Sequence, residues 1–599
     1  MNFFAADHHH MSFSQALRPT IRRMLSASSF GAVMLAIPVA HAQTSPIVNC
    51  ESLLTSFTFP NTTITGATYS NGGYYCGTDT WHVCFSNLPP SCQVTAEMTP
   101  TSDSDINVTV WMPTEGYNGR YLGTGNGGYA GSYFQSELAQ GINYGFATAN
   151  TDMGTSGGVP PTDGISADGL VGHPQKWIDF GWRSTYLMTQ FSKALINAFY
   201  GAPPSHSYFA GCSTGGQSAL MEAQRFPNDY DGILAGAPAH NRTHLHTVLI
   251  AQYAATHSTT TGAPSTGYIP TPTGFNAVNA AVLNQCVGHD HGAPTDNFLT
   301  DPRLCKFNPA SMQCPNNVPG ASCLTTAQVA TFNEYYQGPV NPSNGAIINP
   351  GNIRGSEGDT NQLPEEVGPL GLGMAFNENL NEPAFDSLFK WVFGSTWRWE
   401  TFDFNTNVAE VDQVLAQDLN ATSTDLSAFQ SHGGKLILYA GWADPLIPSP
   451  STINYFNDVT ETMYGPLSAG TIKQSQQFMR LYMAPGMWHC GASVAGGPGP
   501  NSFGGMIQQP TPSYDTEHNL LAALTQWVEQ GEAPGPVVAT KYVNDTPQLG
   551  IQMQRPICVF PEIAEYDGEG DATQPSSFRC VKDEGAAYNN EKPAPQYGP

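Results

Sequence analysis

Residues 207–227 read SYFAGCSTGGQSALMEAQRFP and place a serine between an apolar run and a helical pattern. The run at 207–210 predicts a short buried strand. Residues 217–225 predict a helix, because their apolar side chains recur at helical spacing. Between them, residues 211–215 form G-x-S-x-G around Ser213. Since a sharp turn between a strand and a helix exposes such a serine hydroxyl, the stretch predicts an α/β fold in which Ser213 is a nucleophile.

A second match to the same pattern shows why the context decides. Residues 154–158 also fit G-x-S-x-G, in a chain that has 61 glycines. The residues that follow, GVPPTDG, cannot continue as a helix because of their two prolines. We therefore place Ser156 in a loop and keep Ser213 as the candidate nucleophile.

The composition restricts the partners. The chain has 599 residues, enough for the cores of two or three domains. It carries 22 basic and 48 acidic residues, a formal net charge of −26. This charge argues against nucleic acid and against anionic membrane surfaces as partners. We expect a substrate that is neutral or is met by a few local basic groups.

The first 42 residues have the pattern of a secretion signal with some upstream residues. An apolar run at 25–39 follows three arginines and precedes an A-x-A cleavage site at 40–42. The run is too short for a comfortable membrane anchor. We expect a mature chain that begins at Gln43 and is secreted or periplasmic. The twelve cysteines, an even number without any C-x-x-C pair, then predict disulfides rather than a metal site.

Strand and helix patterns alternate in two separated segments of the chain. The second segment resumes at Gly434, and we expect the tail after about Cys558 to be irregular. The predicted elements are strands within 106–146, a helix at 182–200, strands at 232–236, 435–440 and 478–483, and a helix at 517–530.

The segment between them has a different composition. Residues 255–380 are rich in Pro, Gly, Asn and Thr and hold four closely spaced cysteines. This predicts a large inserted, disulfide-tied lid domain at 241–400, which divides an α/β domain into parts at 43–240 and 401–599. An aromatic cluster at 385–399 closes the insertion, and it is either lid core or the wall of an apolar substrate pocket.

An acid and a histidine follow the serine in the order that an α/β-hydrolase requires. Asp444 comes four residues after the strand at 435–440, where a carboxylate can orient an imidazole. His489 lies six residues after the strand at 478–483, in a loop from which a general base can reach the serine. His518 falls in a predicted helix start, so we interpret it as a surface or helix-terminus residue.

Two cysteines flank this predicted triad. Cys212 precedes Ser213, and Cys490 follows His489. A disulfide between them would tie the turn of the nucleophile to the loop of the base, and catalysis depends on such positioning. It would also close a long loop, which stabilises the fold by roughly 5 kcal/mol in the chain-entropy model.

An oxyanion hole needs two backbone N–H groups. One is expected from Thr214, the residue after the nucleophile, and the other from a glycine-rich loop after an earlier strand. Residues 121–128, YLGTGNGG, predict that loop, with Gly125 as the donor; a plain glycine turn is the alternative. The segment does not match a phosphate-binding loop, because no G-K-[ST] follows it.

Together these residues resemble the tannase and feruloyl esterase family of secreted α/β-hydrolases, which includes mono(hydroxyethyl) terephthalate hydrolases. The resemblance spans nearly all of the mature chain. It rests on GCSTGG with Cys212 and Ser213, ILYAGWAD with Asp444, and PGMWHC with His489 and Cys490. It implies the disulfides Cys212–Cys490, Cys50–Cys92, Cys286–Cys305, Cys314–Cys323 and Cys558–Cys580, which leaves Cys76 and Cys84 to pair with each other.

The chain departs from the family pattern at two places. The family has a calcium site in a lid loop resembling C-D-x-x-D-G-x-x-D-G, but here Val287 replaces the first aspartate and two residues are inserted before Asp296. Asp290 and Asp296 stay candidate ligands of a structural calcium, although calcium prefers six or more oxygens. The second departure is Gln217, where the family often has arginine after the GG pair.

The resemblance implies a serine carboxylic ester hydrolase that needs no cofactor for catalysis. Feruloyl or other hydroxycinnamoyl esters, free or linked to polysaccharide, are the expected substrates. Galloyl esters of tannins are the second candidate and terephthalate monoesters the third, since no arginine-bearing segment for a terephthalate carboxylate is recognisable. An acyltransferase with the same triad and a non-catalytic secreted binding protein are the alternatives from other functional classes.

Overall fold

The computed structural model describes eight segments of the chain, and these segments belong to one compact unit. The predicted signal and its cleavage site lie outside the described residues. None of the helices in the described part combines the length and the apolar character that a bilayer crossing requires. The described residues are 45–79, 83–156, 164–269, 273–358, 383–491, 496–505, 508 and 512–582.

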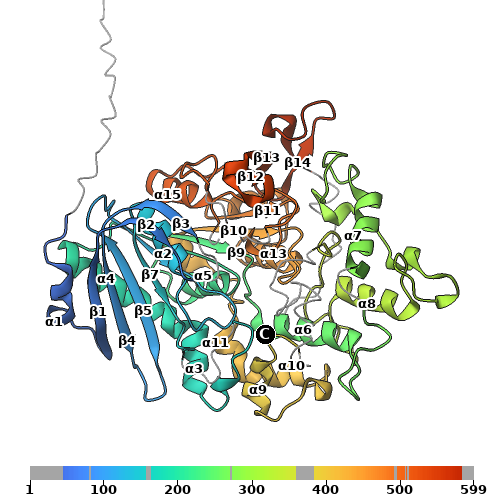
Figure 1. Cartoon of the computed structure of the whole chain (residues 1–599), viewed down its shortest axis with the longest axis horizontal. Coiled ribbons are helices and arrows are strands. Elements are labelled where there is room, and N and C mark those ends of the chain that lie inside the picture. The colour runs from blue at the N-terminus through green and yellow to red at the C-terminus, as the bar shows by residue number, and fades with distance from the viewer. Residues whose placement is uncertain are drawn as a thin grey trace, which may run out of the picture. The chain divides into compact units, whose positions relative to one another are not determined.

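A nine-stranded sheet forms the centre of the fold (Figure 1). Its first four strands pair antiparallel, and every pairing from β7 onward is parallel. In sheet order the strands are β1 (Thr62–Ser70), β4 (Ser91–Met98), β5 (Ile106–Pro113), β7 (Ala147–Thr151), β6 (Arg120–Thr124), β8 (His206–Cys212), β9 (Gly232–Gly236), β10 (Lys435–Gly441) and β11 (Met479–Ala484).

Both faces of the parallel part of the sheet are buried. Along β8, Tyr208 and Ala210 belong to one apolar core and Phe209 to the other; Ile437 and Leu438 of β10 divide in the same way. Strands that are covered on both faces read as continuous apolar runs, which explains SYFA and KLILYA in the sequence. The predicted α/β class is therefore confirmed.

Helices cover the two faces of the sheet. The first core includes α15, whereas α4, α5 and α13 contribute to the second. The helices are α1 (Leu53–Ser56), α2 (Gln135–Asn143), α3 (Pro174–Ile178), α4 (Ser184–Tyr200), α5 (Thr214–Arg225), α6 (Arg242–Thr256), α7 (Thr273–Cys286), α8 (Thr326–Gln337), α9 (Ser387–Phe393), α10 (Asn407–Val411), α11 (Gln417–Leu419), α12 (Ser427–Ser431), α13 (Ser449–Tyr464), α14 (Ala469–Ser475) and α15 (Leu520–Gln530).

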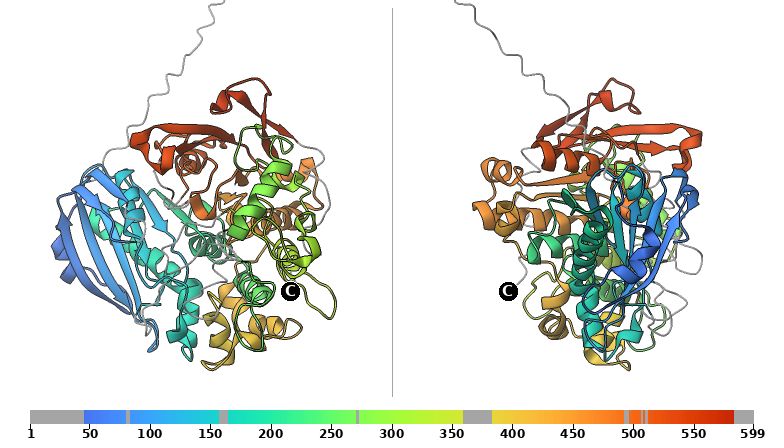
Figure 2. Two further views of the ribbon diagram at one scale, coloured as in Figure 1. Left: turned by 45° about the vertical axis from the view of Figure 1, so that its right-hand side comes forward. Right: turned by 90° about the vertical axis from the view of Figure 1, so that its left-hand side faces the viewer.

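The chain after Cys558 is more regular than its sequence suggests. We expected an irregular tail, but β14 (Glu562–Tyr566) and β15 (Phe578–Lys582) form an antiparallel hairpin there, next to the pair β12 (Val537–Tyr542) and β13 (Ile551–Ile557). Figure 2 shows this C-terminal segment in red beside the green lid region, and the amide of Tyr566 donates to the carbonyl of His291. The hairpin therefore braces the lid.

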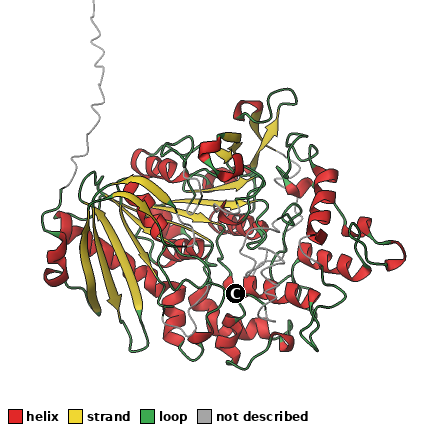
Figure 3. Cartoon of the chain, viewed as in Figure 1, coloured by secondary structure: helices red, strands yellow, loops and turns green. Residues whose placement is uncertain are grey.

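The inserted segment is mainly helical in its first part (Figure 3). Helices α7 and α8 build a small core of their own that includes Val278 and Phe332. The aromatic cluster at 385–399 joins the main core instead, where Trp391 lies 5.5 Å from the ring of Tyr129. Its buried rings support the core interpretation of this cluster. The boundaries 43–240, 241–400 and 401–599 stay predictions.

Six disulfides tie the described residues together, and they are the pairings that the resemblance implied. A further short hairpin, β2 (Gly73–Cys76) with β3 (Cys84–Leu88), carries the smallest loop among them. The bonds are Cys50–Cys92, Cys76–Cys84, Cys212–Cys490, Cys286–Cys305, Cys314–Cys323 and Cys558–Cys580.

Candidate active site

The candidate catalytic residues gather at one edge of the sheet. Strands β6, β8, β10 and β11 run parallel, so their carboxyl ends meet at the same edge. Ser213 follows β8 directly, Asp444 lies three residues beyond β10, and His489 lies five residues beyond β11. Ligands and catalytic groups in α/β sheets occupy this edge, because the loops there converge.

Ser213 sits on a strained turn. Its φ of 63° and ψ of −120° place a non-glycine residue in a sparsely populated backbone region. The turn is held by the Ser213 amide, which donates to the Gly236 carbonyl at 3.0 Å, and by the Gln217 amide, which donates to the Ser213 carbonyl at 3.0 Å. A Cβ on Gly215 would lie 3.0 Å from the amide nitrogen of Asn126, a tighter contact than side chains normally make, so the turn favours glycine there.

Asp444 and His489 form a buried pair. Nδ1 of His489 lies 2.8 Å from Oδ2 of Asp444, whose side chain is fully buried. The other oxygen of Asp444 accepts the amides of Leu446 and Ile447, both at 2.9 Å. Since a carboxylate only accepts, Nδ1 of His489 carries the proton and its Nε2 is left as a base. This is the tautomer that a general base needs.

The disulfide Cys212–Cys490 brings the serine and the histidine together. It joins residues that are 278 positions apart, and its Cα atoms are 5.9 Å apart. Ser213 and His489 are the direct chain neighbours of its two half-cystines, and Nε2 of His489 lies 3.5 Å from the sulfur of Cys490. The covalent link therefore fixes the loop of the base against the turn of the nucleophile.

The predicted oxyanion donor Gly125 does not fit that role. Its amide donates to the Ala210 carbonyl at 2.9 Å, which extends the pairing of β6 with β8 by one bond. The next amide, that of Asn126, and the amide of Thr214 have no acceptor among the described residues. The Asn126 carbonyl accepts the Gly215 amide at 2.6 Å, so this loop lies against the first turn of α5.

Sequence reasoning missed two residues near the nucleophile, Asn126 and Arg242. Only the register of β6 against β8 reveals which amide of the glycine-rich loop is free. Arg242 is buried, with 1% of its surface exposed, and contacts Thr214 and Gln217 at the start of α5. No spacing or motif in the sequence marks it, because Arg242 and Thr214 are 28 residues apart in the chain.

The two aspartates of the lid loop are already occupied. Asp290 accepts the amides of Gly288 and Gly292 at 3.2 Å each and that of Thr300 at 2.6 Å. Asp296 pairs with the guanidinium of Arg555 at 2.7 Å. Within the described segments, no group of three or more His, Cys, Asp or Glu side chains is arranged to hold a metal ion. These residues therefore do not fit calcium, which needs several free carboxylate oxygens.

The two other residues weighed from the sequence lie outside the site. The hydroxyl of Ser156 donates to Asp152 in a loop after β7, and residues 157–163 fall outside the described residues. His518 lies just before α15 and bonds to Asp515 at 2.9 Å. Neither side chain has a hydrogen bond or ion pair with Asp444 or His489 among the described residues.

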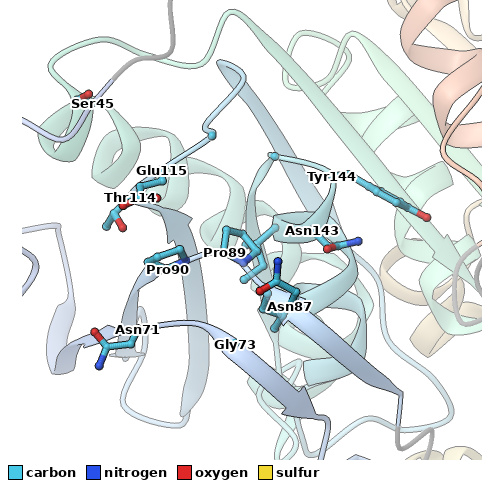
Figure 4. A pocket seen from close by; sticks show the side chains of 14 residues that line it. Ser45, Asn71, Gly73, Asn87, Pro89, Pro90, Thr114, Glu115, Asn143 and Tyr144 are labelled. Carbon is cyan, nitrogen blue, oxygen red and sulfur yellow. The ribbon is translucent and has the colours of Figure 1, made fainter.

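A large open hollow occupies the opposite edge of the sheet (Figure 4). It has a volume of about 1010 Å³ and is lined by polar side chains such as Asn71, Asn87 and Asn143. Its walls include Gly116 and Gly145, which precede the amino ends of β6 and β7. None of the candidate catalytic side chains lines it, so we assign it no part in the chemistry.

Comparison with known proteins identifies the family. A family model described as tannase and feruloyl esterase matches residues 92–581. An uncharacterized esterase of Xanthomonas campestris pv. campestris is 35% identical, over 91% of this chain and 93% of that protein. A probable feruloyl esterase B-2 of Aspergillus flavus is 32% identical over 78% of this chain and 83% of that protein. The crystal structure of feruloyl esterase B from Aspergillus oryzae matches with a TM-score of 0.75 at 28% identity, covering 89% of this chain and 99% of that chain. The chain therefore belongs to the tannase and feruloyl esterase family of carboxylic ester hydrolases.

Proposed function

We propose that the chain is a secreted serine esterase that hydrolyses feruloyl and related hydroxycinnamoyl esters. The observation that carries this proposal is the constellation at the sheet edge. There the strained turn of Ser213 is covalently joined, through Cys212 and Cys490, to the loop whose histidine pairs with Asp444. A serine, a base and an orienting acid in this order are the parts of a hydrolase triad.

Each residue has a distinct chemical role. Ser213 attacks the ester carbonyl while Nε2 of His489 takes the proton of its hydroxyl. Asp444 holds His489 in the reactive orientation and stabilises the imidazolium that forms. His489 then gives the proton to the leaving alcohol. Water hydrolyses the resulting acyl-enzyme, with His489 again as the base.

The oxyanion of each tetrahedral intermediate would lie between two backbone donors. We assign these donors to the amides of Thr214 and Asn126, in place of Gly125. Both amides are free of acceptors among the described residues. The Thr214 amide opens α5, and the loop that holds Asn126 lies against the first turn of this helix. The amino end of a helix adds a partial positive charge to this position.

Family membership and the names of relatives support the choice of acyl group. The Aspergillus relatives are named feruloyl esterases, and they match this chain over most of its length. Galloyl esters are the second candidate, because the family model also covers tannases. The six disulfides support the proposed extracellular or periplasmic location, since such bonds persist in oxidising compartments.

Product release from methyl ferulate and methyl gallate, measured by chromatography, tests the proposal. We expect wild type to release ferulate faster than gallate and Ser213→Ala to release neither. Faster release of gallate than of ferulate would show that galloyl esters, rather than feruloyl esters, are the preferred substrates. An acyl ester formed with an added alcohol, in preference to free acid, would instead identify an acyltransferase. Failure to hydrolyse both esters would overturn the proposed substrate class.

A further inference from the structure

Arg242 is a buried cation beside the nucleophile that the triad does not use. It is the first residue of α6, and its side chain is among the largest fully buried ones. Its Nε donates to the side-chain oxygen of Gln217 at 2.7 Å, and one terminal nitrogen donates to Oγ1 of Thr214 at 2.7 Å. The guanidinium also lies 4.9 Å from the centre of the Phe180 ring.

No carboxylate neutralises this charge within the described segments, whose ion pairs do not include Arg242. Its other polar neighbours are His246, 3.5 Å away, and the phenol of Tyr129, whose pKa burial raises well above its usual value. Burial and the nearby guanidinium lower the pKa of His246 well below its usual value, so this neighbour is neutral. Burial lowers the pKa of Arg242 to about 10, which leaves it protonated at neutral pH. A buried charge without a partner of opposite sign is costly.

The positive charge of Arg242 lies at the positive end of the α5 dipole. Thr214 is the first residue of α5, so Arg242 meets the positive end of the helix dipole. Two positive potentials at one place destabilise the resting enzyme. They become favourable when a negative charge forms at the same place, as it does on the carbonyl oxygen after the attack of Ser213.

The contact with Thr214 also fixes the geometry of the donor. Oγ1 of Thr214 accepts from Arg242 and donates to the Gly128 carbonyl at 2.7 Å. The side-chain oxygen of Gln217 accepts from Arg242, and its side-chain nitrogen donates to the Leu419 carbonyl at 2.5 Å. The guanidinium of Arg242 therefore binds two side chains of the first turn of α5, those of Thr214 and Gln217.

We propose that Arg242 is a positioning residue for the ester hydrolysis, which orients the Thr214 amide and supplies a positive potential for the oxyanion of the tetrahedral intermediate. The inference rests on the proposed function of Ser213. Its effect is specific to the state that carries negative charge, so substrate binding in the neutral ground state changes little.

The test compares Arg242→Met with wild type in three measurements. These are kcat and KM for methyl ferulate, the fraction of protein labelled by a fluorophosphonate, and the Kd of an arylboronic acid, which forms an anionic tetrahedral adduct with a serine. We expect kcat per labelled site to fall about tenfold to a hundredfold with KM within about twofold. The Kd of the boronic acid should rise by a similar factor, and Arg242→Lys should recover part of both losses.

Two further variants separate this role from a structural one. Arg555→Met removes another buried guanidinium, far along the chain, and should leave kcat per labelled site unchanged. Thr214→Val keeps the amide but removes the hydroxyl that receives the guanidinium, and should show a smaller loss with the same pattern. It also tests the inference if Arg242→Met does not fold.

Unchanged kcat and unchanged boronic acid affinity in folded Arg242→Met, or in Thr214→Val where Arg242→Met does not fold, would overturn the inference while leaving the proposed function intact. Wild type that neither labels at Ser213 nor hydrolyses the ester would instead overturn the proposed function and this inference with it.

Discussion

Two buried arginines in this molecule are held in opposite ways. Arg555 lies between the C-terminal hairpins and the lid loop and pairs with Asp296, and both side chains are about 3% exposed. Arg242 lies beside the nucleophile, and its hydrogen-bond partners among the described residues are neutral: Gln217, Thr214 and His246. The first arrangement satisfies the charge in the resting protein, and the second leaves it unsatisfied.

The difference separates a structural region from a chemical one. A paired buried charge stabilises the contact between two segments, because removal of either partner leaves the other uncompensated. Arg242 has neutral hydrogen-bond partners but no carboxylate among the described residues, and on our proposal negative charge that develops during the reaction stabilises it further. Substitutions near Ser213 should therefore reduce rate more than stability, and substitutions in the lid should do the reverse.

The largest effect is expected from Asp444→Asn, in the chemical region. The amide would favour the wrong tautomer of His489, so kcat should fall by about 10⁴ while the fold remains. Steady-state kinetics and thermal unfolding, measured on the same preparation, check this expectation. A variant that kept a tenth of the wild-type kcat would remove Asp444 from the triad.

Arg555→Met should have the largest effect on stability. Asp296 would be left buried without its partner, which costs about 3 to 5 kcal/mol of unfolding free energy. Denaturant unfolding measures the loss, and Asp296→Asn combined with Arg555→Met should recover part of it. If Arg555→Met lowered kcat per labelled site as strongly as Arg242→Met, the two regions would not differ in the way described.

Glu357 in the lid should make stability depend on pH. Burial raises its pKa from 4.5 to about 7, so the folded state holds a proton that the unfolded state has lost. Stability should therefore fall by up to about 3 kcal/mol as pH rises from about 4.5 to about 7. Glu357→Gln, which can still accept from Tyr336, should remove this fall. The melting temperatures of wild type and Glu357→Gln are measured at pH 5 and pH 8. The same fall in melting temperature for both proteins would show that Glu357 does not cause the pH dependence.

Removal of calcium should have the smallest effect in the lid. The oxygens of Asp290 accept three backbone amides and Asp296 pairs with Arg555, so neither offers a free carboxylate. We expect the melting temperature to change by less than about 1 °C between excess chelator and millimolar calcium. A rise of several degrees with calcium would show that the loop rearranges around the ion.

The sequence predicted what depends on local pattern. The apolar run before Ser213 and the helix after it identify the turn, and the strand ends before Asp444 and His489 place both at the same edge. The helix expected from residue 182 begins at Ser184 instead, after a π-helical turn at Asp179–Arg183. Such a boundary depends on packing rather than on hydrophobic spacing.

Features that depend on distant pairing could not be predicted. The sequence predicts Gly125 as the donor in the glycine-rich loop, but the sheet register commits its amide to Ala210, and our proposal assigns the role to Asn126 instead. The hairpin of β14 and β15 was missed since its strands are short and separated by a polar loop. Arg242 has no sequence signal at all, as its partners Thr214 and Gln217 belong to a different helix.

The most direct test of the account is to identify the residue that becomes acylated. Wild type and Ser213→Ala would be treated with a fluorophosphonate, digested and analysed by mass spectrometry. The account predicts one adduct, on the peptide that contains Ser213, with loss of both the adduct and esterase activity in Ser213→Ala. An adduct on another serine, or esterase activity that survives in Ser213→Ala, would contradict it.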